Sequence, residues 1–130
     1  MTSIHPVLTY NDAHAAIDFL ERAFGFERRG VFEADDGKVA HAELALDGEF
    51  VGLSSTGAGD PMFAQGAGRT SVYIAVSDVD AICDRARSAG ATIEMEPTDQ
   101  DYGSRDFVAR DPEGNLWCFG TYELGSSGTP

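Results

Sequence analysis

The chain carries two similar segments, residues 4–55 and residues 70–122, and this duplication constrains its fold more than any other feature. In each segment an apolar run leads to an aspartate, an amphipathic stretch follows, and a turn with a glycine comes later. The matching landmarks are 66 positions apart in both cases, Asp12 with Asp78 and Gly48 with Gly114. A constant offset at two distant landmarks requires few insertions between them. We therefore expect duplicated modules, longer than solenoid repeats of about 20–50 residues; chance similarity of two small α+β units is the alternative.

Hydrophobic periodicity predicts the same order of elements in both segments, which is one strand, one helix and three further strands. In the first segment Asn11 or Asp12 caps a helix that ends at Gly25. In the second, Asp78 begins the helix and Gly90 follows as a left-handed cap. The expected strands are residues 4–10, 27–34, 38–46 and 49–55, then 70–76, 91–97, 104–110 and 115–122. The pattern predicts an α+β fold in which two βαβββ modules form curled mixed sheets around a cleft.

The predicted domain organisation is a single domain over residues 1–124. Its modules are joined by residues 56–69, a glycine-rich stretch without periodicity that is typical of a linker or a pocket-rim loop. Residues 125–130 are expected to form a disordered tail. At 130 residues such a chain can bury one compact core.

The chain is strongly acidic, with 22 acidic and 9 basic residues and a net charge of −13. This charge opposes binding to nucleic acids and to anionic membrane surfaces, and it favours cationic small molecules at a cleft. No apolar run approaches the roughly 20 residues of a membrane helix, and the start of the chain lacks the pattern of a signal peptide. We therefore expect a cytoplasmic protein with reduced cysteines, and neither Cys83 nor Cys118 has zinc-site spacing.

Strand alternation assigns side chains to the two faces of each sheet. Bulky apolar groups, namely Val51, Leu53, Trp117 and Phe119, suit the face that a helix covers. In residues 41–46 the apolar members claim the core side, and this turns His41 and Glu43 toward the cleft.

The motifs resemble those of the vicinal oxygen chelate superfamily, which includes glyoxalase I, extradiol dioxygenases and bleomycin-resistance proteins. The resemblance covers residues 4–122 and rests on four features: His5 in the opening strand, the stretch from Asp12 to Phe26, Ser77-Asp78-Val79-Asp80, and Asp111-Pro112-Glu113-Gly114-Asn115 before an aromatic strand. It implies the same fold. It does not fix the activity, because function on a shared scaffold depends on the site.

In glyoxalase-like members of that superfamily, four strands supply ligands to a divalent metal. The matching positions here are His5, Gly52, Tyr73 and Cys118, and only His5 is an ordinary ligand for such a metal. The resemblance therefore implies that the usual metal site is lost and that no cofactor is needed. The alternative is a displaced divalent-metal site made of His5, His41 and Glu43.

Residues 101–115 are most similar to bleomycin-resistance proteins, which are acidic, metal-free dimers that sequester a planar cationic antibiotic. Tyr102 occupies the position of a stacking aromatic in that group. The resemblance predicts a small-molecule-binding protein that sequesters a planar or cationic ligand without catalysis. The predicted ligand-binding residues are His5, His41, Glu43, Tyr73, Tyr102, Arg105, Phe107 and Cys118. No catalytic residue is assigned.

Two other functions remain open at this stage. One is a metal-dependent lyase, isomerase or dioxygenase that uses the displaced site, and the other is a protein-interaction module without a well-formed cleft. Exposed sheet edges favour pairing, so a homodimer is expected, with or without exchange of modules between its chains.

Overall fold

The computed structural model describes residues 1–58 and 61–126 of the chain. Within this part, each module has one helix and four strands in the predicted order. The first module comprises β1 (Val7–Tyr10), α1 (Ala13–Phe24), β2 (Glu27–Glu33), β3 (Val39–Leu46) and β4 (Glu49–Ser55). The second comprises β5 (Ser71–Ala75), α2 (Val79–Ser88), β6 (Thr92–Asp99), β7 (Arg105–Arg110) and β8 (Leu116–Gly120). The predicted α+β fold of two βαβββ modules is confirmed.

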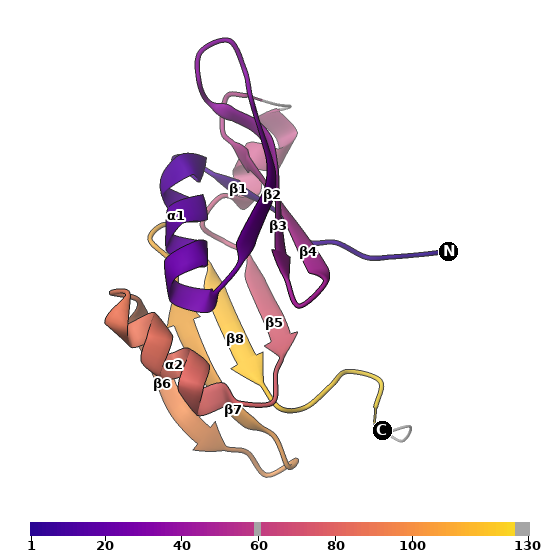
Figure 1. The fold of residues 1–130 in the computed structure, drawn as a ribbon, viewed down its shortest axis with the longest axis vertical. Helices are drawn as coiled ribbons and strands as arrows, with labels where there is room; N and C mark the ends of the chain where they lie inside the picture. Colours follow the sequence, from indigo (N-terminus) through magenta and orange to yellow (C-terminus); the bar gives the residue numbers. More distant parts are fainter. Residues whose placement is uncertain (59–60, 127–130) are drawn as a thin grey trace.

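The two four-stranded sheets have equivalent topology, β1-β4-β3-β2 and β5-β8-β7-β6, and each contains one parallel pair. Even the register repeats, because Val7 pairs with Gly52 and Tyr73 pairs with Cys118, and both residues of the second pair follow those of the first by 66 positions. The two sheets remain separate and do not close into a barrel. Figure 1 shows them end to end along the long axis, with α1 and α2 on the same side.

Both helices begin with the same local structure, as the repeated aspartates predict. Asp12 and Asp78 have φ/ψ of −125°/84° and −116°/83°, and each carboxylate accepts a hydrogen bond from the backbone N–H three residues later, at 3.0 Å. Gly25 ends α1 with a φ of 85°, a left-handed conformation that side chains other than glycine rarely adopt. These caps satisfy backbone groups that a helix alone leaves without partners.

The core lies between the helices and the sheets and is shared by the two modules. Phe24 of α1 contacts both Trp117 and Phe119 of β8, with ring centroids 5.6 and 4.8 Å apart. Arg85 of α2 donates hydrogen bonds to the carbonyl groups of Glu21 and Arg22 at the end of α1. Each module therefore buries apolar surface that belongs to the other, and the position of one sheet relative to the other is set by this packing.

A buried polar network also joins the modules. Asp111, in the turn before β8, is 4% exposed and accepts hydrogen bonds from the Tyr10 hydroxyl at 2.6 Å and the Trp117 indole N–H at 3.0 Å. The next residue but one, Glu113, accepts hydrogen bonds from the backbone N–H groups of Asn11 and Asp12 at 2.7 Å. We call residues 111–115 the fastening turn, since it ties the second module to the N-terminus of α1.

Most strand bounds differ from the sequence prediction by one or two residues, and the larger differences lie in two segments. The first strand begins at Val7 rather than Ile4, because Pro6 has no N–H and contributes only its carbonyl, which accepts from Gly52. The inter-module segment contains a short 3-10 helix, η1 (Pro61–Gly66), where no regular structure was expected. Residues 127–130 of the predicted tail, and residues 59–60 of the loop, lie outside the described residues.

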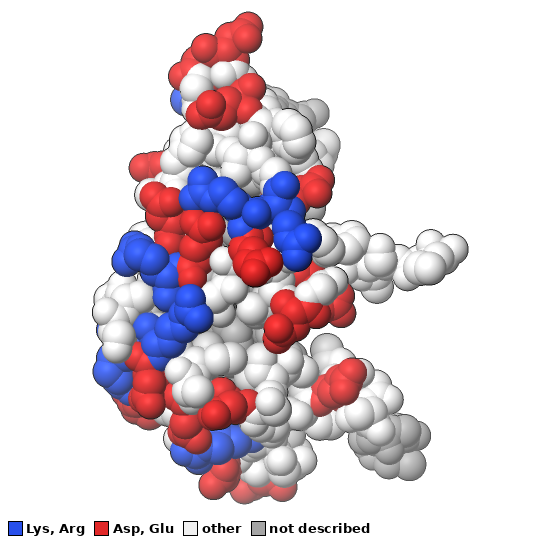
Figure 2. Space-filling view, in the orientation of Figure 1, with Lys and Arg blue, Asp and Glu red and all other residues white. Residues whose placement is uncertain are grey.

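The described part of the chain contains no helix with the length and hydrophobicity required to cross a membrane. Its charged groups are distributed unevenly. On the face in Figure 2, most basic side chains lie in a band across the middle of the molecule, and acidic side chains lie at both ends and also between the basic groups.

Candidate functional site

The face of each sheet opposite its helix is open. In the first sheet, strand alternation places Val7, Thr9, His41, Glu43, Gly52 and Ser54 on this face, while Leu8, Ala42 and Leu53 are fully buried beneath the helix. Part of the open face forms a cavity of about 330 Å³, which we call the sheet-1 hollow. Its lining residues are Val7, Thr9, Ala40, His41, Ser54, Ser55, Thr56, Gly57, Phe63 and Ala64. The last two belong to η1, so the inter-module segment does form a pocket rim.

His41 and Glu43 form a polar pair on this open face, as strand alternation predicts. The Nε2 atom of His41 is 2.9 Å from an oxygen of Glu43, and both side chains are half exposed. The ring of Phe32 is stacked on His41, with centroids 6.1 Å apart and an angle of 15° between the planes. The pair therefore combines a carboxylate, an imidazole and a flat apolar surface.

His5 lies outside this group, on the extended arm that precedes β1. Its ring nitrogens are within hydrogen-bond distance of the Ser3 hydroxyl and of the Phe50 carbonyl, at 2.8 and 3.4 Å. Across residues 1–58 and 61–126, no three His, Cys, Asp or Glu side chains are grouped so that they could hold a metal ion. His5 is therefore not assembled with His41 and Glu43 into the displaced three-ligand set.

The positions that match the glyoxalase-type metal ligands do not fit a metal either. Gly52 has no side chain, and a Cβ added there would lie 3.2 Å from a methyl carbon of Val7, so little room remains for a longer residue. The Tyr73 hydroxyl donates to the carbonyl of Tyr122 at 2.5 Å. Burial, with a smaller contribution from Asp106, raises the pKa of the Cys118 thiol and disfavours the thiolate that binds metals.

The open face of the second sheet is built around a buried carboxylate. Asp106 is 4% exposed and accepts hydrogen bonds from the hydroxyl groups of Ser104 and Tyr102. The hydrogen bond to Asp106 raises the pKa of Tyr102 to about 12, with burial adding to the effect. Tyr73 and Cys118 are adjacent in the register of this sheet. We call Asp106, Tyr102, Ser104, Tyr73 and Cys118 the Asp106 cluster. Three of them, Tyr73, Tyr102 and Cys118, are predicted site residues.

Two predicted site residues point the other way. Phe107 is fully buried and stacked on Phe119 beneath α2, with ring centroids 5.2 Å apart. Arg105 lies two residues before it on the same face of β7 and donates to Asp80 of α2 at 2.9 Å. Their assignment to the cleft was wrong, because Phe107 pairs with Phe119 in the register, and alternation puts both on the helix side.

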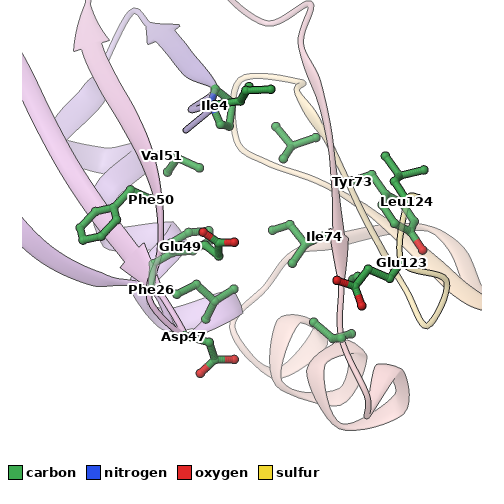
Figure 3. A pocket seen from close by; sticks show the side chains of 15 residues that line it. Ile4, Phe26, Asp47, Glu49, Phe50, Val51, Tyr73, Ile74, Glu123 and Leu124 are labelled. Carbon is green, nitrogen blue, oxygen red and sulfur yellow. The ribbon is translucent and has the colours of Figure 1, made fainter. Parts of the chain in front are cut away.

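A second cavity, which the sequence did not indicate, lies between the modules and has a volume of about 460 Å³ (Figure 3). We call it the inter-module cavity. One wall comes from the first module and the other from β5, and both chain ends contribute to its rim. Its lining residues are Ile4, Pro6, Phe26, Leu46, Asp47, Glu49, Phe50, Val51, Val72, Tyr73, Ile74, Ala75, Val76, Glu123 and Leu124. Tyr73 is the single predicted site residue among them.

Residues 3–119 match the family model described as the Glyoxalase/Bleomycin resistance protein/Dioxygenase superfamily. Among curated proteins, the uncharacterized protein Mb0911c of Mycobacterium bovis is 36% identical over 124 residues, which are 91% of this chain and 82% of that protein. The uncharacterized protein Rv0887c of Mycobacterium tuberculosis is also 36% identical over 124 residues, 91% of this chain and 73% of the relative.

Solved structures show the same architecture. TioX from Micromonospora sp. ML1 is 36% identical, with a TM-score of 0.76 over 93% of this chain and 100% of TioX. A glyoxalase/bleomycin resistance protein/dioxygenase family enzyme from Burkholderia phytofirmans PsJN is 22% identical, with a TM-score of 0.68 over 89% of this chain and 94% of the other. At that lower identity the second likeness concerns the fold alone.

Proposed function

Because the chain belongs to the glyoxalase/bleomycin resistance protein/dioxygenase superfamily, we propose that it is a small-molecule-binding protein that holds a planar or cationic ligand without transforming it. The proposed site uses the open faces of the two sheets, with His41 and Glu43 on the first and Tyr73, Tyr102 and Cys118 on the second. His5 would border the site from the N-terminal arm. Arg105 and Phe107 take no part in it, because they face α2.

One observation supports this proposal above the others, and it is the exposure of large flat or apolar side chains on the open faces. Val7, Phe32, Phe63 and Tyr102 are each about 60% exposed, whereas the aromatic residues beneath the helices are buried. A flat ligand that covers such groups removes their apolar surface from water, and this favours binding. Glu43 beside the Phe32–His41 stack adds negative charge where such a ligand would lie.

A homodimer and a cytoplasmic location complete the proposal. Each open face is one side of a cleft, and the two sheets of a single chain lie end to end rather than face to face. A second copy that covers these faces would supply the missing wall. The exposed arm from Met1 to His5 is also available for contact with such a copy.

The proposal is tested by calorimetric titration with ethidium, a planar aromatic cation, in parallel with Tyr102→Ala and Tyr102→Phe. We expect binding to weaken at least about tenfold in Tyr102→Ala, since the stacking surface is lost, and to persist in Tyr102→Phe, which keeps the ring. Equal binding in all three proteins would remove Tyr102 from the site.

Thermal unfolding of the same protein sample distinguishes this proposal from the alternative, a metal-dependent enzyme. Under the proposal, thermal unfolding is unchanged by Zn²⁺, Mn²⁺ or Ni²⁺ and responds to ethidium. A stabilisation by one of these ions that is lost in both His41→Ala and Glu43→Gln would favour the enzyme instead.

A further inference from the structure

The inter-module cavity lies apart from the open face of the first sheet and has its own chemical character. Its volume of about 460 Å³ falls within the range of small-molecule sites, roughly 300–1,000 Å³. The walls are apolar, with Phe26 and Val51 on one side and Ile74 on the other, and Figure 3 shows these side chains facing each other across an open gap. A flat hydrocarbon body would fill this space and remove apolar wall from water.

The rim of the cavity carries negative charge alone. Asp47, Glu49 and Glu123 are acidic, and none of the lining residues is Lys, Arg or His. The three carboxylates come from two parts of the chain, the β3–β4 hairpin, where Glu49 is the first residue of β4, and the segment after β8. Figure 2 shows acidic side chains on both sides of the notch between the projecting chain ends.

These carboxylates belong to the acidic groups that have no basic side chain paired with them in the described part of the chain. Seven other acidic side chains pair with arginine, namely Asp18, Glu21, Glu27, Asp80, Glu94, Glu96 and Asp99. Within the described residues, no ion pair involves Asp47, Glu49 or Glu123. Their negative potential is therefore not cancelled locally, and it is available to a bound cation.

One wall also offers hydrogen-bonding groups of the backbone. β5 is an edge strand that pairs with β8 on one side, and no strand of the described chain pairs with its other side. Residues 72–76 line the cavity along this strand. A ligand with a polar N–H or O–H near its aromatic body could use the free carbonyl groups of such an edge.

We propose that the inter-module cavity is a second binding site, which takes a small amphiphilic organic cation with its apolar body between Val51 and Ile74 and its positive group at Asp47, Glu49 and Glu123. The inference does not depend on the open-face site, since the two sites share only Tyr73. Figure 3 shows the Tyr73 ring directed away from the gap, and the register places Tyr73 beside Cys118.

The test uses three probes with the same aromatic body and different charge: 1-naphthylmethylamine, 1-naphthalenemethanol and 1-naphthoate. Binding is followed by naphthalene fluorescence and by calorimetry. We expect the amine to bind at least about tenfold more tightly than the alcohol, and the carboxylate most weakly. The preference should shrink between low salt and about 0.5 M salt, because the rim is exposed to solvent.

Charge variants show whether the rim causes this preference. The triple variant Asp47→Asn, Glu49→Gln, Glu123→Gln should bring the amine to the affinity of the alcohol and leave the alcohol unchanged. Asparagine suits position 47, whose φ is 49°. The matched control, Asp35→Asn, Asp84→Asn, Asp101→Asn, has the same net charge (−13 + 3 = −10) outside the cavity and should keep the full preference.

Substitutions that fill one cavity or the other with a tryptophan side chain test where the probes bind. Ile74→Trp places a large ring on the side of β5 that faces the gap and should weaken all three probes at least about tenfold. Ala40→Trp, the control, fills the sheet-1 hollow and should leave them unchanged. Loss of binding in Ala40→Trp but not in Ile74→Trp would place the amine in the open-face site and overturn this inference, while the proposed function would stand.

Two further results would also overturn it. One is equal affinity for the amine and the alcohol. The other is no binding of any probe, which is the result expected if a second copy of the chain covers the cavity in solution. Sedimentation of the same samples identifies that case. If the affinity for ethidium is unchanged in Tyr102→Ala, the result contradicts the open-face proposal alone.

Discussion

The two modules share a fold and an equivalent strand register, yet they differ in the side chains on their open faces. Val7 and Gly52 form the same register pair as Tyr73 and Cys118. On the open faces, however, the first module has a hollow beside His41 and Glu43, while the second has tyrosines around a buried Asp106. The two modules therefore share one scaffold, and differences at single positions account for the chemistry of each face.

The turn between the last two strands shows the same contrast. In the first module, Asp47 and Gly48 make a short turn whose side chains point to solvent and to the inter-module cavity. In the second module, the equivalent turn is the fastening turn, which is bonded into the other half of the molecule. Equivalent positions thus line the inter-module cavity in one module and stabilise the contact between the modules in the other.

The largest expected effect comes from removing the carboxylate at the centre of the fastening turn. Asp111→Ala should lower the free energy of unfolding by about 3–5 kcal/mol, because buried donors on Tyr10, Trp117 and Asn115 lose their acceptor. Its equivalent in the first module, 66 positions earlier, is Ala45. Urea unfolding measures the change, and a loss below about 1 kcal/mol would mean that the network is not needed to hold the modules together.

The next effect tests the difference between the two open faces. Gly120 occupies the position of Ser54 in the first module (120 − 66 = 54), and a Cβ at Gly120 would overlap Asp106 and the Tyr73 hydroxyl. Gly120→Ser should therefore cost about 2–3 kcal/mol through displacement of the Asp106 cluster. The reverse change, Ser54→Gly, should cost no more than about 1 kcal/mol. Thermal unfolding of the two variants gives the comparison, and equal losses would contradict it.

A smaller effect separates the two equivalent acidic turn positions. Glu113→Gln should destabilise the protein by about 1–1.5 kcal/mol, because a charged acceptor for two backbone N–H groups at the start of α1 becomes neutral. Asp47→Asn, at the equivalent position (113 − 66 = 47), should change stability by less than about 0.5 kcal/mol. Chemical denaturation of both variants at low salt is the measurement.

The smallest effect concerns alkaline stability. Burial, followed by the charge of Asp111, raises the pKa of Tyr10 well above its ordinary value of 10.0. The hydroxyl then ionises in the unfolded chain but not in the folded one, so its contribution to stability is complete below pH 10 and is lost as pH rises further. Wild-type protein should lose about 1 kcal/mol more than Tyr10→Phe between pH 10 and 11. Parallel pH profiles of the two proteins would contradict this assignment.

The sequence predicts the repeated elements well because their signals are local. The N-caps at Asp12 and Asp78 and the apolar stripes of both helices depend on residues within a few positions of one another. Alternation likewise predicts that His41 and Glu43 face away from α1. The same rule places Phe107 with Phe119 on the face that the helix covers, which contradicts the assignment of Phe107 and Arg105 to the cleft.

The inter-module cavity could not be predicted in this way. Its walls come from Phe26, Val51 and Ile74, which are far apart in the chain and face each other only after α1 and α2 have packed. The distance between the two sheets is set by that packing and by the fastening turn, and neither has a local sequence signal. The pairing of Glu113 with the start of α1 was missed for the same reason, since it spans about 100 residues.

The fastening turn has a consequence for the history of such chains. Once Asp111 and Glu113 supplied partners to Tyr10 and to the first turn of the opposite helix, neither half could leave the other without exposing unsatisfied groups. A gene fragment encoding one half alone would then yield an incomplete product rather than a small ancestral protein. The repeat would still be recognisable in the sequence, although the halves could no longer fold apart. Later evolution could then alter either open face but could not recombine the halves as independent units.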